Sequence, residues 1–211
     1  MLICDADLTV TDGLVKVLLN TMKKYRGAYA AVPKMYFGGT DLIWWSGAYE
    51  KHQHGIKGVG LSDTGLYNKV TCGSFVGTCS LIDIGIFKEY SMWFDDEFFI
   101  YHEDIDVMEF LDNGVYGIYQ PNALAYHNVE LKVTGEYFDI FRAYMTFRNR
   151  LIMGIRHIDP VGFFISFIHY LKLSELPSKL KLRAILYGIK LGLFKLFGFY
   201  KGKIIDSKEY K

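Results

Sequence analysis

The sequence predicts an α/β fold in which a mixed sheet carries flanking helices and is followed by a basic amphipathic helical tail. Apolar residues make up 51% of the 211 residues, which is enough to bury a core. Short apolar runs typical of buried strands alternate with segments of helical periodicity. The charged residues are also unevenly distributed along the chain. Residues 160–211 carry 10 Lys or Arg against 3 Asp or Glu, and the preceding residues carry 14 against 20.

Composition excludes several classes of protein. A net charge of +1 with high apolar content excludes an intrinsically disordered chain and a strongly basic nucleic-acid-binding protein. Cys4, Cys72 and Cys79 contain no CxxC pair, so we expect neither a disulfide framework nor a structural zinc site. The start of the chain lacks the pattern of a signal peptide, and the longest apolar run, 161–171, is shorter than the roughly 20 residues that cross a bilayer.

The periodicity predicts each element in order. The first strand ends at Cys4. A helix follows from Leu14 to a last turn that contains Lys23, Lys24 and Arg26, with Thr11 or Asp12 as its N-cap and Gly27 as its stop. Residues 28–37 form a strand in which Pro33 indicates an edge or a bulge. The remaining predicted elements are a long loop at 38–65, a strand at 70–84, a helix at 103–111, strands at 115–119 and 123–127 separated by Pro121, and a helix at 137–158. We therefore expect a domain over 1–158 and a helical tail over 159–211.

Asp5 and Asp7 are the first candidate ligands for a metal ion. They stand at the end of a predicted strand, where residues i and i+2 of extended backbone point to the same side. Two carboxylates on one side can share a hard divalent cation, Mg²⁺ or Mn²⁺, that also bridges phosphate oxygens. The alternative is a solvated, Asp-rich turn before a helix, because such short motifs are common.

A second acidic cluster consists of Glu103, Asp104 and Asp106, directly after an aromatic stretch. An aromatic wall would partly desolvate one carboxylate and raise its pKa, which suits a general base. Since i and i+1 on a helix point in different directions, only one of the first two can face a cation site. The alternative is that these acids only stabilise a helix N-terminus.

His127 and Arg148 complete the candidate site. His127 ends a predicted strand and is either a third metal ligand or a structural histidine. Arg148 belongs to the run Arg148-Asn149-Arg150 on the long helix. That run is either a phosphate clamp, because guanidinium groups match phosphate oxygens, or a solvated basic patch.

The order of these motifs resembles the family 2 glycosyltransferases, especially the rhamnosyltransferase-like branch. The matching stretches are ICDADLTV, FVGTCSLIDIGIF, FDDEFFIYHEDIDVMEFLDNG, YQPNALAYH and YMTFRNRLIM, spread over residues 1–157. The resemblance implies a partial GT-A fold and inverting, metal-dependent sugar transfer from a nucleotide-sugar. It implies that Asp5 and Asp7 hold the metal and the donor diphosphate, that His127 is a third ligand and that Asp104 is the base.

The chain departs from the family pattern in one respect, because the family carries a nucleotide-binding half ahead of the DxD motif and this sequence does not. We therefore expect the chain alone to have little transferase activity, since binding of the nucleotide base and ribose comes from that half. The alternatives are a catalytically inactive remnant that acts as a membrane-surface binding module, and a metal-dependent phosphohydrolase.

The tail predicts a membrane-surface partner through residues 179–201. Its apolar side chains recur at helical spacing and its basic side chains lie on another side, which is typical of interfacial helices. The alternative is a helix that packs on its own domain. We expect a peripheral protein at the cytoplasmic face of the plasma membrane, acting on a glycan or lipid-linked acceptor in cell-surface polysaccharide synthesis. The apolar residues are Leu182, Ile185, Leu186, Ile189, Leu193, Leu196 and Tyr200, and the basic ones are Lys179, Arg183, Lys190 and Lys201.

Overall fold

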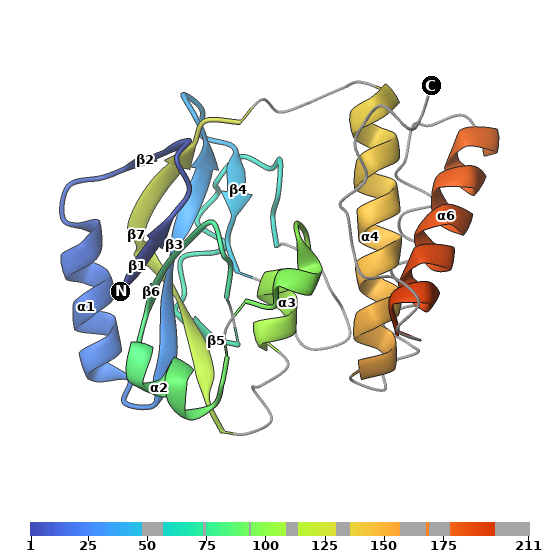
Figure 1. Ribbon diagram of the computed structural model, residues 1–211. Helices are drawn as coiled ribbons and strands as arrows, with labels where there is room; N and C mark the ends of the chain where they lie inside the picture. Colours follow the sequence, from blue (N-terminus) through green and yellow to red (C-terminus); the bar gives the residue numbers. More distant parts are fainter. Residues whose placement is uncertain are drawn as a thin grey trace. The chain divides into compact units, whose positions relative to one another are not determined.

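The chain divides into two compact units, Met1–Thr134 and Gly135–Lys211. The computed structural model, shown in Figure 1, describes residues 1–47, 57–73, 75–92, 94–108, 114–129, 136–156, 168 and 178–196. The division falls ahead of the expected boundary at 158/159. The reason is that the long helix of the second unit packs on the tail helix, so the two belong together.

The first unit is built on a seven-stranded mixed sheet, which confirms the α/β class with a mixed sheet and flanking helices. The path through the sheet is β1 (Leu2–Cys4), β6 (Cys79–Ile82), β3 (Ala28–Phe37), β7 (Tyr116–His127) and β2 (Leu8–Val10), with β4 (Ile43–Trp45) beside β3 and β5 (Thr71–Cys72) beside β7. Strands β3 and β7 pair in parallel, and the other described pairs are antiparallel. The predicted strand at 70–84 is thus two short strands, β5 and β6, on different partners.

The two central strands meet at a bulge. Pro33 of β3 lies opposite Gln120, and the next residue, Lys34, lies opposite Leu124, so β7 has extra residues at this point. Pro121 falls in that irregular stretch, where a missing backbone N–H costs no ladder hydrogen bond. The expected pair of strands around Pro121 is therefore one strand, and β3 is central rather than an edge strand, with Pro33 at the bulge.

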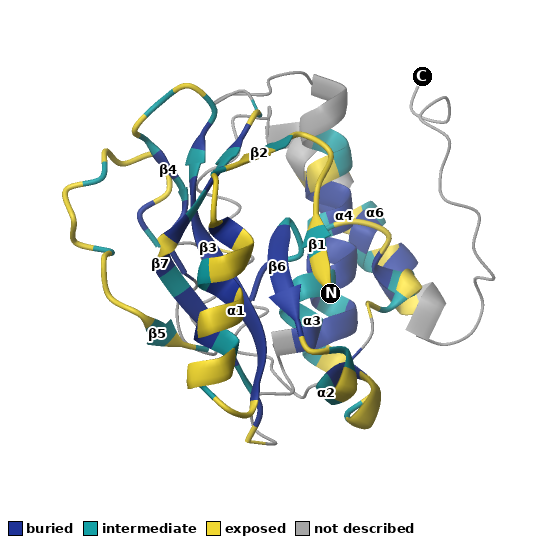
Figure 2. Ribbon diagram, turned by 90° about the vertical axis from the view of Figure 1, so that its left-hand side faces the viewer, coloured by how far each residue is buried: buried dark blue, intermediate teal, exposed yellow. Residues whose placement is uncertain are grey.

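Helix α1 (Leu14–Lys24) packs on β3 and β7 through Leu14 and Leu18, and Figure 2 shows its outward side exposed. Its N-cap is Gly13, at φ 82°, and not Thr11 or Asp12. Thr11 is held elsewhere, because its hydroxyl donates to the backbone oxygen of Leu124 at 2.8 Å. The other elements of this unit are α2 (Ile84–Glu89), the short η1 helix (Asp96–Phe98) and α3 (Glu103–Met108).

The second unit contains α4 (Glu136–Arg156) and α6 (Ser178–Leu196), which pack closely. Two glycines make the close approach possible. A Cβ at Gly188 would lie 2.7 Å from the backbone oxygen of Tyr144, and one at Gly192 would lie 3.3 Å from that of Arg148. Glycines four residues apart let two helix backbones approach without a steric clash. Among the described helices, none is long and apolar enough to cross a membrane.

The buried side chain of Lys34 holds the segment that follows β4. Lys34 is 1% exposed, and its Nζ lies 2.7 Å from Oδ2 of Asp63, which also accepts a hydrogen bond from the Tyr36 hydroxyl at 2.6 Å. Burial opposes ionisation of Asp63, but hydrogen bonds from Lys34, Tyr36 and the backbone of Gly65 lower its pKa to about 2. This carboxylate therefore stabilises the fold above its unfolded pKa of 3.8, and the stabilisation is lost as the pH falls through about 2.

Replacing Asp63 by asparagine should destabilise the protein by about 3–5 kcal/mol at pH 7, because it leaves the Lys34 ammonium buried without a counterion. Urea unfolding followed by circular dichroism measures this change. Asp41→Asn, at an exposed aspartate, is the matched control and should change stability by less than about 0.5 kcal/mol. A loss below about 1 kcal/mol in Asp63→Asn would contradict the role of the pair.

Candidate metal centre

Asp5 and Asp7 lie in the turn that joins β1 and β2, the strands at the two ends of the path through the sheet. The turn is anchored at both ends. The backbone N–H of Asp5 donates to the oxygen of Thr78 at 2.9 Å, and the N–H of Asn128 donates to the oxygen of Asp7 at 2.9 Å. The backbone here is a turn rather than the extended segment that we expected, since the N–H of Leu8 donates back to the oxygen of Asp5 at 3.3 Å.

His127 is placed by strand pairing on both sides of β7. It lies opposite Leu8 of β2 and opposite Phe37 of β3. Its backbone oxygen also accepts from the N–H of Gly38 at 2.8 Å. Gly38 approaches closely, because a Cβ there would lie 3.1 Å from Cα of Asn128, so a larger residue would force this neighbour to shift. The end of β7 is therefore held next to the turn that carries the two aspartates.

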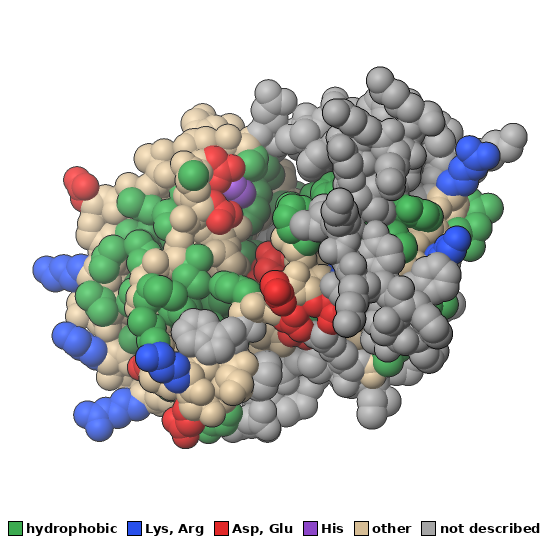
Figure 3. Space-filling view, viewed as in Figure 1, with side chains coloured by type: hydrophobic (Ala, Val, Ile, Leu, Met, Phe, Trp, Pro, Cys, Tyr) green, Lys and Arg blue, Asp and Glu red, His purple; other side chains and the backbone are tan. Residues whose placement is uncertain are grey.

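These three residues form a compact group, called here the Asp5–Asp7–His127 cluster. One ligand atom from each lies within 4.8 Å of the others, and Nε2 of His127 lies 3.1 Å from Oδ1 of Asp7. Both aspartates are exposed and the histidine is 7% exposed. Figure 3 shows a histidine between acidic side chains on one face of the first unit. The sequence predicted these three as ligands, and the structure brings all three together.

The orientation of His127 fits a ligand. The ring of Trp44 meets it edge to face at a centroid distance of 4.3 Å. Nδ1 is buried and has no hydrogen-bond partner among the described residues, so Nε2 is the nitrogen that faces Asp7. With a proton on Nε2 the ring donates to the carboxylate. With the proton on Nδ1, the ring offers a lone pair to the space beside two carboxylates, which is a donor set that suits Mn²⁺ or Mg²⁺.

The second acidic group lies in the same unit, on α3. Gly77 precedes Thr78, the residue that anchors Asp5, and a Cβ at Gly77 would lie 3.9 Å from both Oε1 of Glu103 and Cβ of Asp104. Figure 3 shows this second patch of acidic side chains over α3. The chain enters α3 through two residues with positive φ, Tyr101 at 66° and His102 at 74°. Such backbone is costly for residues other than glycine and is concentrated at functional sites.

Glu103, which precedes the predicted base Asp104, has a raised pKa. Burial, the neighbouring Asp104 and the more distant Asp5 together raise the pKa of Glu103 to about 7. Its Oε2 is buried and has no hydrogen-bond partner among the described residues, whereas Oδ1 of Asp104 accepts from the N–H of Ile105 at 2.8 Å. Asp5 contributes the smallest part of this shift, so the two acidic groups are only weakly coupled.

Arg148 lies in the second unit, on α4. Arg148, Asn149 and Arg150 are all buried, so the alternative of a solvated basic patch is wrong. Nη1 of Arg148 donates to Oδ1 of Asn149 at 2.5 Å. The phosphate-clamp interpretation stays a prediction.

Sequence reasoning missed two residues of this site. Trp44 lies in the stretch that we expected to be an irregular loop, and only the pairing of β4 with β3 brings it to His127. Asp104 rather than Glu103 was predicted as the general base, although the sequence shows that Glu103 has an acidic neighbour and stands at the start of a predicted helix. Which of two adjacent carboxylates is desolvated depends on tertiary packing, so spacing alone does not decide it.

Comparison of the chain with protein-family models, with curated proteins and with solved structures finds no match. The assignment of a function therefore depends on the residues themselves and on their geometry.

Glu103→Gln should make the protein more stable at pH 8, by about 1–2 kcal/mol after allowance for solvent screening. Between pH 4.5 and about 7 the folded protein keeps a proton that the unfolded chain has lost, so wild-type stability falls as the pH rises through this window. The glutamine variant lacks this dependence. Urea unfolding at pH 5 and pH 8 measures it.

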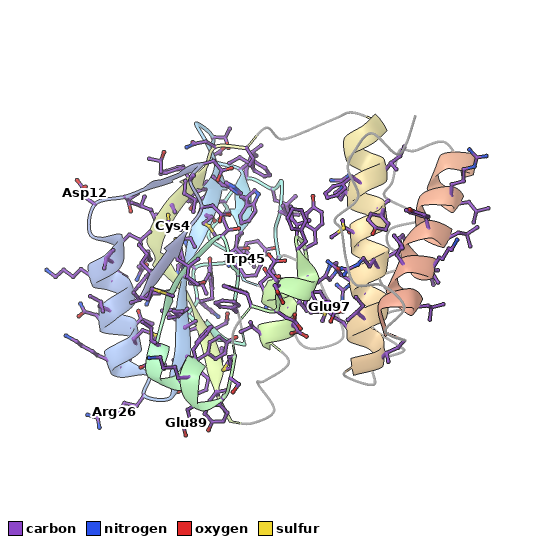
Figure 4. All side chains as sticks on the ribbon, viewed as in Figure 1. Cys4, Asp12, Arg26, Trp45, Glu89 and Glu97 are labelled. Carbon is purple, nitrogen blue, oxygen red and sulfur yellow. The ribbon has the colours of Figure 1, made fainter. Side chains whose placement is uncertain are left out.

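Glu89, exposed at the end of α2 and labelled in Figure 4, gives the matched control Glu89→Gln, which should keep the wild-type pH dependence. Equal pH dependence in Glu103→Gln and wild type would contradict the raised pKa of Glu103.

Proposed function

We propose that the first unit is the acceptor-side part of a GT-A glycosyltransferase domain, of the family 2, rhamnosyltransferase-like type. It would transfer a sugar from a nucleotide-sugar to a glycan or a lipid-linked acceptor, with inversion at the anomeric carbon. The observation that carries the proposal is the Asp5–Asp7–His127 cluster. Its members include residues 120 positions apart, yet their ligand atoms lie within 4.8 Å of one another. The order of motifs in the sequence supports the same reading.

In this proposal the cluster would hold Mn²⁺ or Mg²⁺ together with the donor diphosphate. The cation would supply stabilisation of the negative charge that develops on the departing diphosphate. Asp104 accepts the proton of the acceptor hydroxyl while the hydroxyl oxygen forms a bond to the anomeric carbon. The bond from that carbon to the diphosphate oxygen breaks on the opposite side, and the electron pair leaves with the diphosphate.

The acidic surroundings also support the proposal of a bound cation. Asp5, Asp7, Glu103 and Asp104 gather four carboxyl groups in one region of the first unit. A diphosphate would be repelled there without a positive charge. A divalent cation at the cluster both relieves this repulsion and attracts phosphate oxygens.

Purified protein should bind Mn²⁺, and Asp5→Ala combined with Asp7→Ala should weaken this binding at least tenfold, because two of three ligands are removed. Electron paramagnetic resonance of free Mn²⁺ during a titration measures the affinity. The fluorescence of Trp44 should change in the same titration, since its ring meets His127.

Asp12→Ala combined with Asp41→Ala is the matched control, because both aspartates are exposed and Asp12 points outward from the loop before α1 in Figure 4. This control should bind Mn²⁺ as wild type does. Equal Mn²⁺ affinity in wild type and in the Asp5/Asp7 variant would contradict the proposed site.

Asp104→Asn should lower sugar transfer by about 10²–10⁴-fold in any preparation that shows transfer, since it removes the general base. Its Mn²⁺ affinity should stay within about twofold of wild type, because Asp104 is not a proposed ligand. Measured with a mixture of nucleotide-sugars, turnover that falls in Glu103→Gln but not in Asp104→Asn would transfer the role of base to Glu103.

A further inference from the structure

Helix α6 has two different apolar sides, and only one of them is used inside the second unit. The buried side contains Ile185, Gly188, Leu191 and Gly192, and its two glycines lie against the backbone of α4. Ile185 is only 3% exposed, so it does not belong to an exposed apolar face, although the spacing in the sequence predicted it there. The glycine side of the helix is therefore explained by packing within the unit.

The other side is an exposed ridge of leucines. Leu182 is 56% exposed, Leu186 57% and Leu193 37%. Steps of four and seven residues place these three side chains on one line along the helix. Large apolar side chains that are scattered singly need no explanation, but three in line on one helix form a continuous strip.

Basic side chains border this leucine ridge. Arg183 and Lys190 are exposed and are seven residues apart, so they form a second line beside the leucines. Residues 178–196 contain no Asp or Glu. A strip of leucines bordered by Arg and Lys, with no acidic residue, is complementary to a surface that is apolar below and anionic above, as an anionic lipid layer is.

We propose that α6 lies on an anionic lipid surface, with Leu182, Leu186 and Leu193 inserted at the headgroup boundary and Arg183 and Lys190 among the headgroups. This inference is independent of the proposed sugar transfer. The helix would lie in the plane of the surface rather than cross it, since none of the described helices is apolar enough to span a membrane.

Sedimentation with vesicles tests the proposal on the whole chain. At low salt the protein should bind vesicles of phosphatidylcholine that contain 25–30% phosphatidylglycerol. Its affinity for these vesicles should exceed that for pure phosphatidylcholine by roughly fivefold for each basic residue at the surface. High salt should release much of it. Replacing Leu182, Leu186 and Leu193 by Gln should weaken binding at least about tenfold. Arg183→Glu with Lys190→Glu should weaken it by roughly 25-fold or more.

Helix α1 supplies matched controls, because it exposes Val15 at 42% and Leu19 at 44% beside the exposed Lys16 and Lys23. Val15→Gln with Leu19→Gln, and Lys16→Glu with Lys23→Glu, should each change binding less than about twofold. We expect all variants to remain folded, because every substituted side chain is exposed. Their unfolding midpoints check this.

A reporter variant keeps the test decisive if the triple variant does not fold. Leu186→Trp should show a blue-shifted emission component with anionic vesicles, and Leu19→Trp should not. Failure of wild type to bind anionic vesicles at low salt would overturn the proposal, as would equal loss in the α1 controls. Binding that depends on the basic residues but not on the leucines would also overturn it, because it would indicate a polyanion rather than an inserted lipid surface.

Discussion

Strand β7 pairs with β2 on one side and with β3 on the other, and the candidate metal centre depends on this double pairing. The register sets Leu8 and Phe37 opposite His127. A slip of one residue would turn every side chain of the strand to the opposite face and would take His127 away from Asp7. The bulge between Pro33 and Lys34 sets the register of the last four pairs, so an irregularity in mid-sheet determines the geometry at its end. The close approach of Gly38 to Asn128 secures the same end.

The charge distribution of the first unit follows from the same arrangement. The turn of Asp5 and Asp7 is anchored to Thr78, and the chain just before Thr78 lies beside Glu103 and Asp104. Burial is the largest cause of the raised pKa of Glu103, and repulsion from Asp104 and, less strongly, from Asp5 adds to it. Binding of a divalent cation would reduce the repulsion, so metal affinity and the protonation of Glu103 should be thermodynamically linked.

Local signals in the sequence predicted the parts that depend on neighbouring residues. The strand before Asp5, the helix after Gly13 and the long helix that is α4 all follow from periodicity. The parts that depend on distant pairing were not predictable in this way. The N-cap of α1 is Gly13 rather than Thr11, because the Thr11 hydroxyl donates to the backbone oxygen of Leu124 in β7. Strand β7 continues past Pro121 because a bulge accommodates the proline. The candidate ligands were predictable by residue type, but the partnership of Trp44 and the burial of Glu103 arise from tertiary packing.

We propose that His127 and the two aspartates together bind one cation. Electron spin echo envelope modulation of protein-bound Mn²⁺ tests this most directly, because it detects nitrogen coordinated to the metal. We expect a ¹⁴N modulation in wild type that disappears in His127→Gln, while a protein with Glu103→Gln keeps it. Bound Mn²⁺ without nitrogen modulation in the wild-type protein, or with the same modulation in His127→Gln, would show that His127 is not a ligand.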